Sequence, residues 1–303
     1  MKQGIINLII LLLTLLTFVI SGCTKPGWVI QESSTTNNLR SLWFTDTKTG
    51  TVVGDHGTIL RTTNGGDKWT IQICGTEENL WGVRFIDSMN GWVVGDNGTI
   101  LHTTNGGTTW ILQKRRTENN LYSILCLDDQ TIWIAGSDGT ILHSINEGAS
   151  WIREATGVIN LIWDVFFISQ DTGIAGCGGC IDCPYYGGYI LRTTNSGFIL
   201  YHSEWDKDIS GAIWNIQKYD TTIMSIYGAY YTDANTGIVV GIGGNILKTV
   251  DGGITWTGQK SGTTYDLLNV FFTDAETGIA FGGRYIGQYQ EGIILRTTNS
   301  GST

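Results

Sequence analysis

Three cysteines stand close together in the sequence Cys177-Gly-Gly-Cys180-Ile-Asp-Cys183-Pro, and their thiols could form a disulfide or bind a metal. The spacing C-x-x-C-x-x-C-P also occurs in part of an iron–sulfur ligand run. A fourth ligand is not evident, because the four histidines are dispersed along the chain. In an exported protein such cysteines pair more often than they bind metal. The sequence therefore favours a disulfide and leaves a metal site and free thiols as alternatives, and we expect no cofactor.

Arginines and carboxylates are the other residues that could do chemistry, because a sialidase uses an arginine triad, a tyrosine–glutamate pair and an acid/base aspartate. Arg61, Arg192 and Arg296 do not look like such a triad. They occupy one repeated position, three residues before a recurrent Asn or Asp, and other copies have His102, His143 and Lys248 there. A residue repeated in register is more typical of a strand surface than of an active site.

A glycosidase of another type needs only two carboxylates. Asp164, or Glu204 with Asp206, could supply them, but any pair is weak evidence among 27 acidic residues. We therefore expect a protein that is not an enzyme. The formal charge of −9 also argues against binding nucleic acid or an anionic membrane through bulk charge.

The first residues read as an export signal. Lys2 precedes an apolar run from Ile5 to Ile20, which is shorter than a preferred membrane span. The run closes with I-S-G-C at residues 20–23, which resembles the bacterial lipobox. This predicts a lipoprotein signal peptide over 1–22, a lipidated Cys23, a tether over 23–27 and a folded body over 28–303. An ordinary signal peptide or a membrane anchor is the alternative.

The folded body is a repeat. The markers Asn64, Asn105, Asn146, Asn195, Asp251 and Asn299 follow one another at spacings of 41, 41, 49, 56 and 48 residues. Upstream of each marker is a block such as LWGVRFIDSMNG (80–91), and then a stretch such as WVVGDNGTILHT (92–103). Four short β-like runs in about 41 residues is the size of a propeller blade. We predict an all-β fold, a single β-propeller of six four-stranded blades, with seven blades as the alternative.

The two ends of the body complete one blade in this interpretation. Trp28-Val-Ile-Gln31 matches Trp69-Thr-Ile-Gln72, an outermost strand, yet no turn motif precedes it. The last turn, TTNSGST (297–303), stops one residue before the expected tryptophan. We therefore predict that the N-terminal strand is the outer strand of the last blade and closes the ring.

The turn motif, as in TTNGGDKW (62–69) and TTNGGTTW (103–110), resembles the Asp-box or BNR repeat. With its VVGD-x-GTILRT lead it resembles the propeller family of photosystem II assembly and stability factors and their bacterial lipoprotein relatives. The resemblance covers almost all of the folded body. It implies a staple-like turn, in which the Asn or Asp side chain bonds backbone amides, and it carries little information on chemistry.

Irregularities in the repeat predict a binding face. Insertions at about 176–187, 200–216 and 282–291 are expected on the face opposite the Asp-boxes, and loops on a rigid scaffold concentrate binding residues. Aromatics at the start of the inner strands should surround the channel mouth on that face, with packing between blades as the alternative. The predicted binding residues are Trp81, Tyr122, Trp163, Tyr227, Tyr185, Tyr186, Trp205, Trp214, Arg284, Tyr285 and Tyr289.

These features favour a membrane-anchored, extracytoplasmic scaffold that binds proteins without being an enzyme. A carbohydrate-binding or sialidase-like propeller is the alternative. The expected partners are envelope proteins and a membrane through the lipid anchor, not nucleic acid, with a glycan as a further possibility. The expected location is the bacterial cell envelope, at the outer membrane where there is one.

Overall fold

The computed structural model describes residues 31–178, 189–194, 214–217, 225–286 and 289–301. All of these from Ser33 onward belong to one compact unit. Within the described ranges, no helix has both the length and the hydropathy of a membrane span. The predicted signal peptide, Cys23 and Trp28 lie outside the described residues.

The described chain forms 23 strands in six antiparallel sheets, which we call blades 1 to 6 in chain order. Blades 1 to 3 comprise β1 Leu39–Phe44, β2 Gly50–Gly54, β3 Ile59–Thr62 and β4 Thr70–Gln72; β5 Leu80–Phe85, β6 Gly91–Gly95, β7 Ile100–Thr103 and β8 Ile111–Leu112; β9 Leu121–Cys126, β10 Ile132–Gly136, β11 Ile141–Ser144 and β12 Ile152–Arg153. Blades 4 to 6 comprise β13 Leu161–Phe167, β14 Gly173–Gly178, β15 Tyr189–Thr193 and β16 Asn215–Ile216; β17 Ile226–Tyr231, β18 Gly237–Gly241, β19 Ile246–Thr249 and β20 Thr257–Gln259; β21 Asp266–Phe272, β22 Gly278–Ile286 and β23 Tyr289–Thr297.

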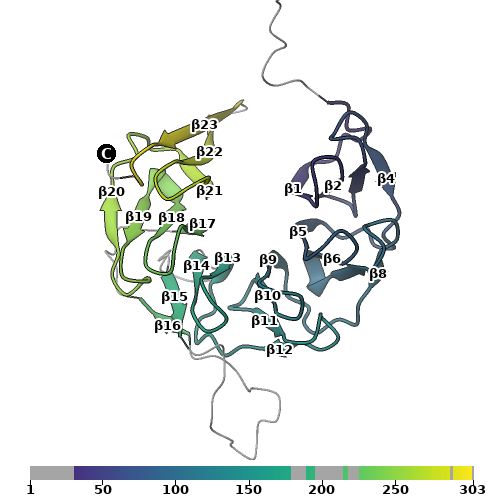
Figure 1. Ribbon diagram of the computed structural model, residues 1–303, viewed down its shortest axis with the longest axis horizontal. Coiled ribbons are helices and arrows are strands. Elements are labelled where there is room, and N and C mark those ends of the chain that lie inside the picture. Colours follow the sequence, from purple (N-terminus) through teal and green to yellow (C-terminus); the bar gives the residue numbers. More distant parts are fainter. Residues whose placement is uncertain (1–30, 179–188, 195–213, 218–224, 287–288, 302–303) are drawn as a thin grey trace, which may run out of the picture. The chain divides into compact units, whose positions relative to one another are not determined.

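Each blade is a meander whose strands pair in chain order. Figure 1 shows the blades around a common centre, with β1, β5, β9, β13, β17 and β21 innermost. Neighbouring inner strands contact one another from β1 to β5 and onward to β21. The prediction of a six-bladed all-β propeller is therefore confirmed. Short 3₁₀ turns at Asp96–Gly98 and Ile242–Gly244 are the helical segments of the described chain.

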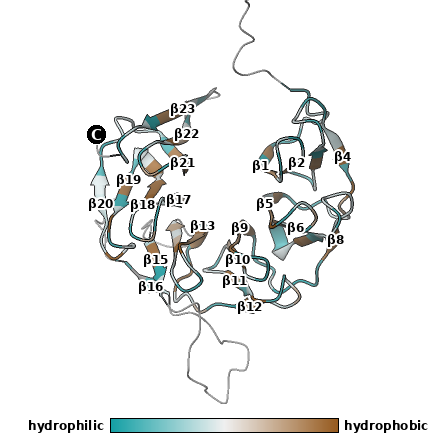
Figure 2. Ribbon diagram, in the orientation of Figure 1, coloured by the Kyte–Doolittle hydropathy of each residue, from teal (hydrophilic) through white to brown (hydrophobic). Residues whose placement is uncertain are grey.

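The second strand of each blade is apolar on both faces because it lies between two neighbouring blades. In β2, β6, β10 and β18 every residue is buried. Runs such as GWVVG therefore lack the alternating pattern of a half-solvated strand. Figure 2 shows hydrophobic stretches on strands around the centre and more hydrophilic colours in many of the turns.

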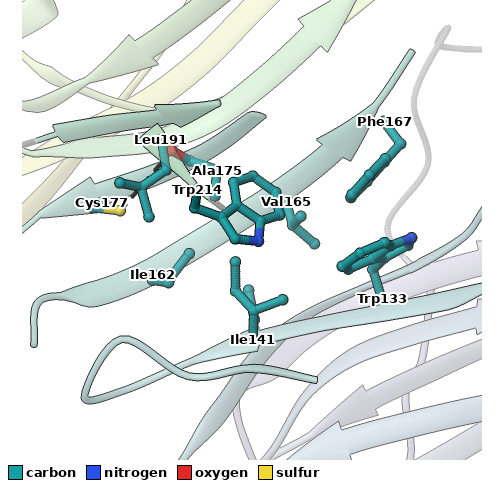
Figure 3. Packing of buried hydrophobic residues seen from close by; sticks show 10 residues of the cluster. Trp133, Ile141, Ile162, Val165, Phe167, Ala175, Cys177, Leu191 and Trp214 are labelled. Carbon is teal, nitrogen blue, oxygen red and sulfur yellow. Dashed lines mark hydrogen bonds between the residues drawn. The ribbon is translucent and has the colours of Figure 1, made fainter. Parts of the chain in front are cut away.

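The contact between blades 3 and 4 illustrates this packing (Figure 3). Trp133 from β10 stacks on Phe167 from β13, with ring centroids 4.1 Å apart. Trp214 meets Phe167 edge to face at 5.8 Å. All three side chains are buried in one cluster that also contains Cys177. Each interface between blades is thus a small core of its own.

The Asp-box turns are stapled as the motif implies. In blade 1 the Thr62 hydroxyl bonds Asn64 Oδ1 at 2.8 Å and accepts the amide of Gly66 at 3.0 Å. Asn64 Oδ1 also accepts the amide of Lys68 at 3.0 Å. Gly66 has φ +97°, which favours glycine. Blades 2, 3 and 5 repeat this pattern.

The insertion at about 200–216 belongs to another connection of blade 4 than the predicted one. Trp214 immediately precedes β16, as Trp69 precedes β4, and it packs on Phe167 as Trp110 packs on Phe85. Trp214 is therefore the box tryptophan of blade 4, displaced from its turn by an insertion. In chain order the extra residues follow β15 and precede β16, so they interrupt the connection that carries the Asp-box and not the connection to blade 5. The prediction of three insertions on the opposite face is wrong for this one.

The insertion at 282–291 is a β-hairpin extension rather than a loop. The pairing of β22 with β23 continues to Ile286 and Tyr289. Arg284 stacks over the ring of Tyr265 at 4.2 Å, and Glu291 is hydrogen-bonded to the Tyr265 hydroxyl and lies 3.5 Å from Arg284 Nη2. These contacts fix the base of the hairpin on blade 6.

Blade 6 has three strands among the described residues, so the predicted closing strand at Trp28 remains a prediction. Side chains at both ends of the blade series are exposed where their equivalents are buried. Phe44 of β1 is 38% exposed, whereas Phe85 at the same position in blade 2 is 5% exposed. Leu42 in blade 1, and Phe281 and Ile294 in blade 6, are exposed as well. One apolar face of blade 1 and one apolar face of blade 6 are thus left exposed.

We predict that blades 6 and 1 pack on each other in solution. Leu42→Ala should then lower the free energy of unfolding by about 2–4 kcal/mol, as for a buried leucine. The control Leu112→Ala, on the outer strand of blade 2, should change it by less than about 0.5 kcal/mol. Urea denaturation measures both. Equal, small effects at the two positions would contradict ring closure.

Acid stability should depend on the one carboxylate among the stapled turns of blades 1, 2, 3 and 5. Hydrogen bonds from Thr255 lower the pKa of Asp251 to about 2. Because the folded pKa lies below the usual value of 3.8, the bond stabilises the fold above about pH 4 and is lost as pH falls toward 2. Between pH 5 and pH 2 the unsubstituted protein should lose about 1 kcal/mol more of its free energy of unfolding than Asp251→Asn, a value already reduced for solvent screening. Denaturant titrations at the two pH values test this, and an unchanged acid loss in the variant would refute it.

Candidate functional site

The candidate site is a row of aromatic side chains at the start of the inner strands. Each inner strand has a register shift near its start, so one residue bulges out of the pairing. It is the second residue of β1, β5, β9 and β17 and the third residue of β13 and β21. The bulged residues are Arg40, Trp81, Tyr122, Trp163, Tyr227 and Leu268. A bulge re-aims a side chain and bends the strand. The same backbone irregularity therefore presents one side chain from every blade.

The bulged side chains contact one another from blade to blade. The Arg40 guanidinium lies 4.4 Å above the Trp81 ring. Trp81 meets Tyr122 edge to face at 5.7 Å, and Tyr122 stacks on Trp163 at 4.8 Å. Trp163 meets Tyr227 edge to face at 5.7 Å. We call this row, Arg40 to Tyr227, the aromatic arc, and it spans five blades.

The structure brings these aromatics into contact between blades, and their role as a binding face stays a prediction. The four rings are half-buried and contact each other between blades, yet they keep exposed surface. A regular alternation of side chains would place Trp81 on the same strand face as Val83 and Phe85, but the bulge breaks the alternation between Leu80 and Gly82. The sequence signal for the bulge is the small or polar third residue of each inner block, such as Gly82.

Carboxylates hold the arc at its first two positions. Arg40 forms two hydrogen bonds with Asp55, at 2.8 and 3.1 Å, and this bonding lowers the pKa of Asp55. Trp81 donates its indole N–H to Asp96 Oδ1 at 2.7 Å. Asp55 and Asp96 stand at the same place, after the second strand of their blades. The arc is thus preorganised, and the charge of Arg40 is paired within the protein.

A polar row lies next to the arc, at the third position of the inner strands. Asp164 accepts the Ser123 hydroxyl at 2.7 Å and the amides of Val165 and Ala229 at 3.0 and 3.3 Å. Burial raises the pKa of Asp164, although Ser123, Arg84 and the amides oppose this shift. These bonds join blades 3, 4 and 5. Asp164 therefore ties inner strands together, and its hydrogen-bond partners are a hydroxyl and two amides rather than a second carboxylate.

The repeated arginines bind backbone between blades. Arg61 Nε donates to the carbonyl of Gly106, in the Asp-box of the next blade, at 2.7 Å. Arg192 does the same to Gly252 at 2.6 Å, and Lys248 Nζ donates to Ser300 at 2.9 Å. These three side chains fasten blades 1, 4 and 5 to the turn of the following blade, so Arg61 and Arg192 do not act together in a carboxylate-binding triad.

Several predicted site residues have other surroundings. Trp214 is buried in the core between blades 3 and 4, so its assignment to the binding face is wrong. Arg284 is half-exposed and holds the base of the β22–β23 hairpin. Tyr285 and Tyr289 lie on that hairpin. Tyr185, Tyr186, Trp205, Glu204 and Asp206 lie outside the described residues.

The cysteines are described in part. Cys177 is a free thiol, fully buried in β14, and burial raises its pKa above the usual range. Cys180 and Cys183 lie outside the described residues, so a bond between those two stays a prediction. Among the residues that the structure describes, no group of His, Cys, Asp and Glu could hold a metal ion.

Comparisons with known proteins agree with the fold. The family model described as "Photosynthesis system II assembly factor YCF48" matches residues 70–158. The structure of YCF48 from Cyanidioschyzon merolae is 19% identical with a TM-score of 0.64, over 89% of this chain and 84% of that one. A structure described as YCF48 bound to D1 peptide is 20% identical with a TM-score of 0.47, over 91% of this chain and 96% of that one.

Glycoside hydrolase propellers are also similar. The GH74 xyloglucanase from Xanthomonas campestris is 10% identical with a TM-score of 0.63, and the match covers 86% of this chain but 47% of the enzyme. No curated protein sequence matches the chain. At such identities the structural matches show a shared fold and leave activity to be argued from the site.

The mutual contacts of the arc predict a stability effect. Tyr122→Leu removes two aromatic contacts, each worth about 0.5–1.5 kcal/mol, and should lower the free energy of unfolding by about 1–3 kcal/mol. Tyr122→Phe keeps both rings in contact and serves as the control. Chemical denaturation of the three proteins measures the difference. A Leu variant as stable as the Phe variant would mean that the arc is not preorganised by ring contacts.

Proposed function

We propose that this chain, an Asp-box propeller that resembles the photosystem II assembly factor family, is a non-enzymatic scaffold that binds a protein partner. The observation that carries the proposal is the aromatic arc, in which five blades each contribute one bulged side chain to a single surface. Tryptophan, tyrosine and arginine are the residues that dominate protein interfaces. A partner that reaches the centre of the propeller would contact all of them at once.

The arc suits a protein partner because it is already ordered. Rings held by neighbouring rings, and an arginine held by Asp55, lose little side-chain entropy when a partner binds. The charge of Arg40 is already neutralised, so recognition would rest on ring edges, tyrosine hydroxyls and shape. Burial raises the pKa of Tyr122 and Tyr227, so both hydroxyls stay protonated and can donate hydrogen bonds at neutral pH.

A carbohydrate site is the alternative, and the ring geometry is less suited to it. A sugar ring packs on an open aromatic face, but one face of Trp81 carries the Arg40 guanidinium. Tyr122 and Trp163 cover each other by stacking. Two of the three repeated arginines that a sialidase-like site would need, Arg61 and Arg192, are bonded to backbone carbonyls of adjacent blades. The arrangement therefore favours protein over glycan.

The location is also part of the proposal. The lipobox-like tetrad at residues 20–23 supports lipidation of Cys23 and attachment to a bacterial envelope membrane on the extracytoplasmic side. The partners would then be envelope proteins. Mass spectrometry of the protein from its own envelope tests the modification, and an unmodified chain that begins at another residue would refute it.

Site-specific photo-crosslinking in intact envelopes tests the scaffold role. A photoreactive residue at Leu268, beside the end of the arc and 49% exposed, should form an adduct with a defined protein. The same residue at Thr108, in the exposed Asp-box turn of blade 2, is the matched control and should form none. Trp163→Ala should weaken the adduct at Leu268 about tenfold or more, as for an interface anchor.

Two outcomes would refute the proposal. Adducts at Thr108 with none at Leu268 would move the binding site to the Asp-box face. Hydrolysis of xyloglucan or sialylated substrates by the purified protein, lost in Asp164→Asn, would make it an enzyme.

A further inference from the structure

We propose that the outer edge of blades 1 and 2 is a membrane-contact patch that takes an anionic phospholipid surface. We call it the rim patch and define it as Ile71, Ile73, Ile111 and Leu112 with the basic run Lys114–Arg116. The patch is separate from the aromatic arc, because it lies on the outermost strands β4 and β8 and the residues after them (Figure 1).

The apolar part of the rim patch is exposed. Ile71 is 60% and Ile73 is 91% exposed, and Ile111 and Leu112 are exposed as well. A soluble protein seldom exposes four large aliphatic side chains on and after two neighbouring outer strands, so these side chains indicate a contact surface. The segments after the two strands approach each other, because Glu78, five residues after Ile73, lies 3.8 Å from Arg115, three residues after Leu112.

The exposure does not arise from the position of blade 1 at the end of the blade series. Leu112 in blade 2 occupies the position of Ile71 in blade 1, since each is paired with the equivalent leucine, Leu101 or Leu60. Blade 2 has a neighbour on both sides, and Leu112 is still exposed. Closure of the ring would therefore leave the apolar edge in place.

Positive charge adjoins the apolar part. Lys114, Arg115 and Arg116 follow β8 directly, and all three are exposed. Arg115 is paired loosely with Glu78, whereas Lys114 and Arg116 extend the patch with positive charge. Lys68, in the turn before β4, is exposed too, beside Asp67. In a chain of formal charge −9, such a run is a local reversal of the prevailing sign.

At the position of Ile71 and Leu112, blade 3 has Arg153 and blade 5 has Gly258, whereas blade 4 has Ile216. In blade 5 the outer strand β20 reads Thr-Gly-Gln, and in blade 3 the outer strand ends with Arg153. Within the described part of the chain, a basic run follows exposed aliphatic side chains of an outer strand at blade 2, and blade 1 adds the exposed Ile71 and Ile73. The repeat itself therefore does not require it.

A lipid surface fits this combination better than a protein does. Aliphatic side chains flanked by Lys and Arg are the pattern of interfacial membrane contact, in which the apolar groups enter the headgroup region and the cations meet lipid phosphates. The acidic remainder of the chain would be repelled by the same surface, so the patch would set one orientation. The apolar run ends at Ile20, and eleven residues of extended chain from there to Gln31 reach at most about 40 Å. A body tethered by that segment stays within reach of the bilayer.

The test measures protection at two sites of the full chain bound to lipid vesicles. Vesicles contain either phosphatidylcholine alone or phosphatidylcholine with phosphatidylglycerol, and trypsin is added outside. Cleavage at Lys114–Arg116 should slow about tenfold or more in the anionic vesicles. Cleavage at Lys260, exposed after β20, is the internal control and should not change. The doubly substituted variant Ile73→Asp, Leu112→Asp should restore cleavage at Lys114–Arg116.

Three outcomes would overturn the proposal. One is equal cleavage at the two sites in anionic vesicles. Another is protection that persists in the doubly substituted variant, and the third is protection of the same size with phosphatidylcholine alone. Because the readout compares two sites within one bound chain, it does not depend on lipidation of Cys23 or on the function of the aromatic arc.

Discussion

Burial between neighbouring blades is the interaction on which the rest of the structure depends. A four-stranded blade has little core of its own, because the apolar side chains of its second strand pack against neighbouring blades, as Val93 does toward blade 1 and Val94 toward blade 3. Trp110 and Phe85 fill one such interface, and Trp214 with Phe167 fills another. The Arg61 and Arg192 bonds to the next Asp-box add directional contacts to the same interfaces. The residues that look most reactive in the sequence are thus used for holding blades together.

The aromatic arc follows from the same packing. Inner strands approach closely around the centre, and a Cβ on Gly82 would lie 3.2 Å from Ile124 of the next blade. The bulge before this third position turns the second residue away from the crowded interface. A repeated backbone defect thereby gives every blade one side chain at the same edge. The repeat sets how many such side chains there are, and the residue type in each blade sets what contacts they can make.

Much of the fold could be predicted from the sequence. The spacing of the markers from Asn64 to Asn299 predicts the blade count, and the bonding of turn amides by the Asn side chain is expected from residue type, whereas the Thr62–Asn64 bond is not. The site was harder to predict, because the one-residue bulge at Trp81 does not change the apolar pattern of the strand and is signalled only by the small residue Gly82 after it. Trp214 was misplaced for a related reason: its turn and its strand are separated by an insertion, so spacing no longer identifies a box tryptophan. The hairpin at 282–291 was taken for a loop because pairing between β22 and β23 depends on register rather than composition.

The central claim is that a protein partner binds at the aromatic arc. The most direct measurement is ¹⁹F NMR of the chain labelled with 5-fluorotryptophan, with resonances assigned by single Trp→Phe substitutions, before and after addition of the purified envelope protein that crosslinks to it. The account predicts shifts for Trp81 and Trp163 and none for Trp110, which is buried at the Asp-box of blade 2. Shifts at Trp110 with unchanged resonances for Trp81 and Trp163 would contradict it.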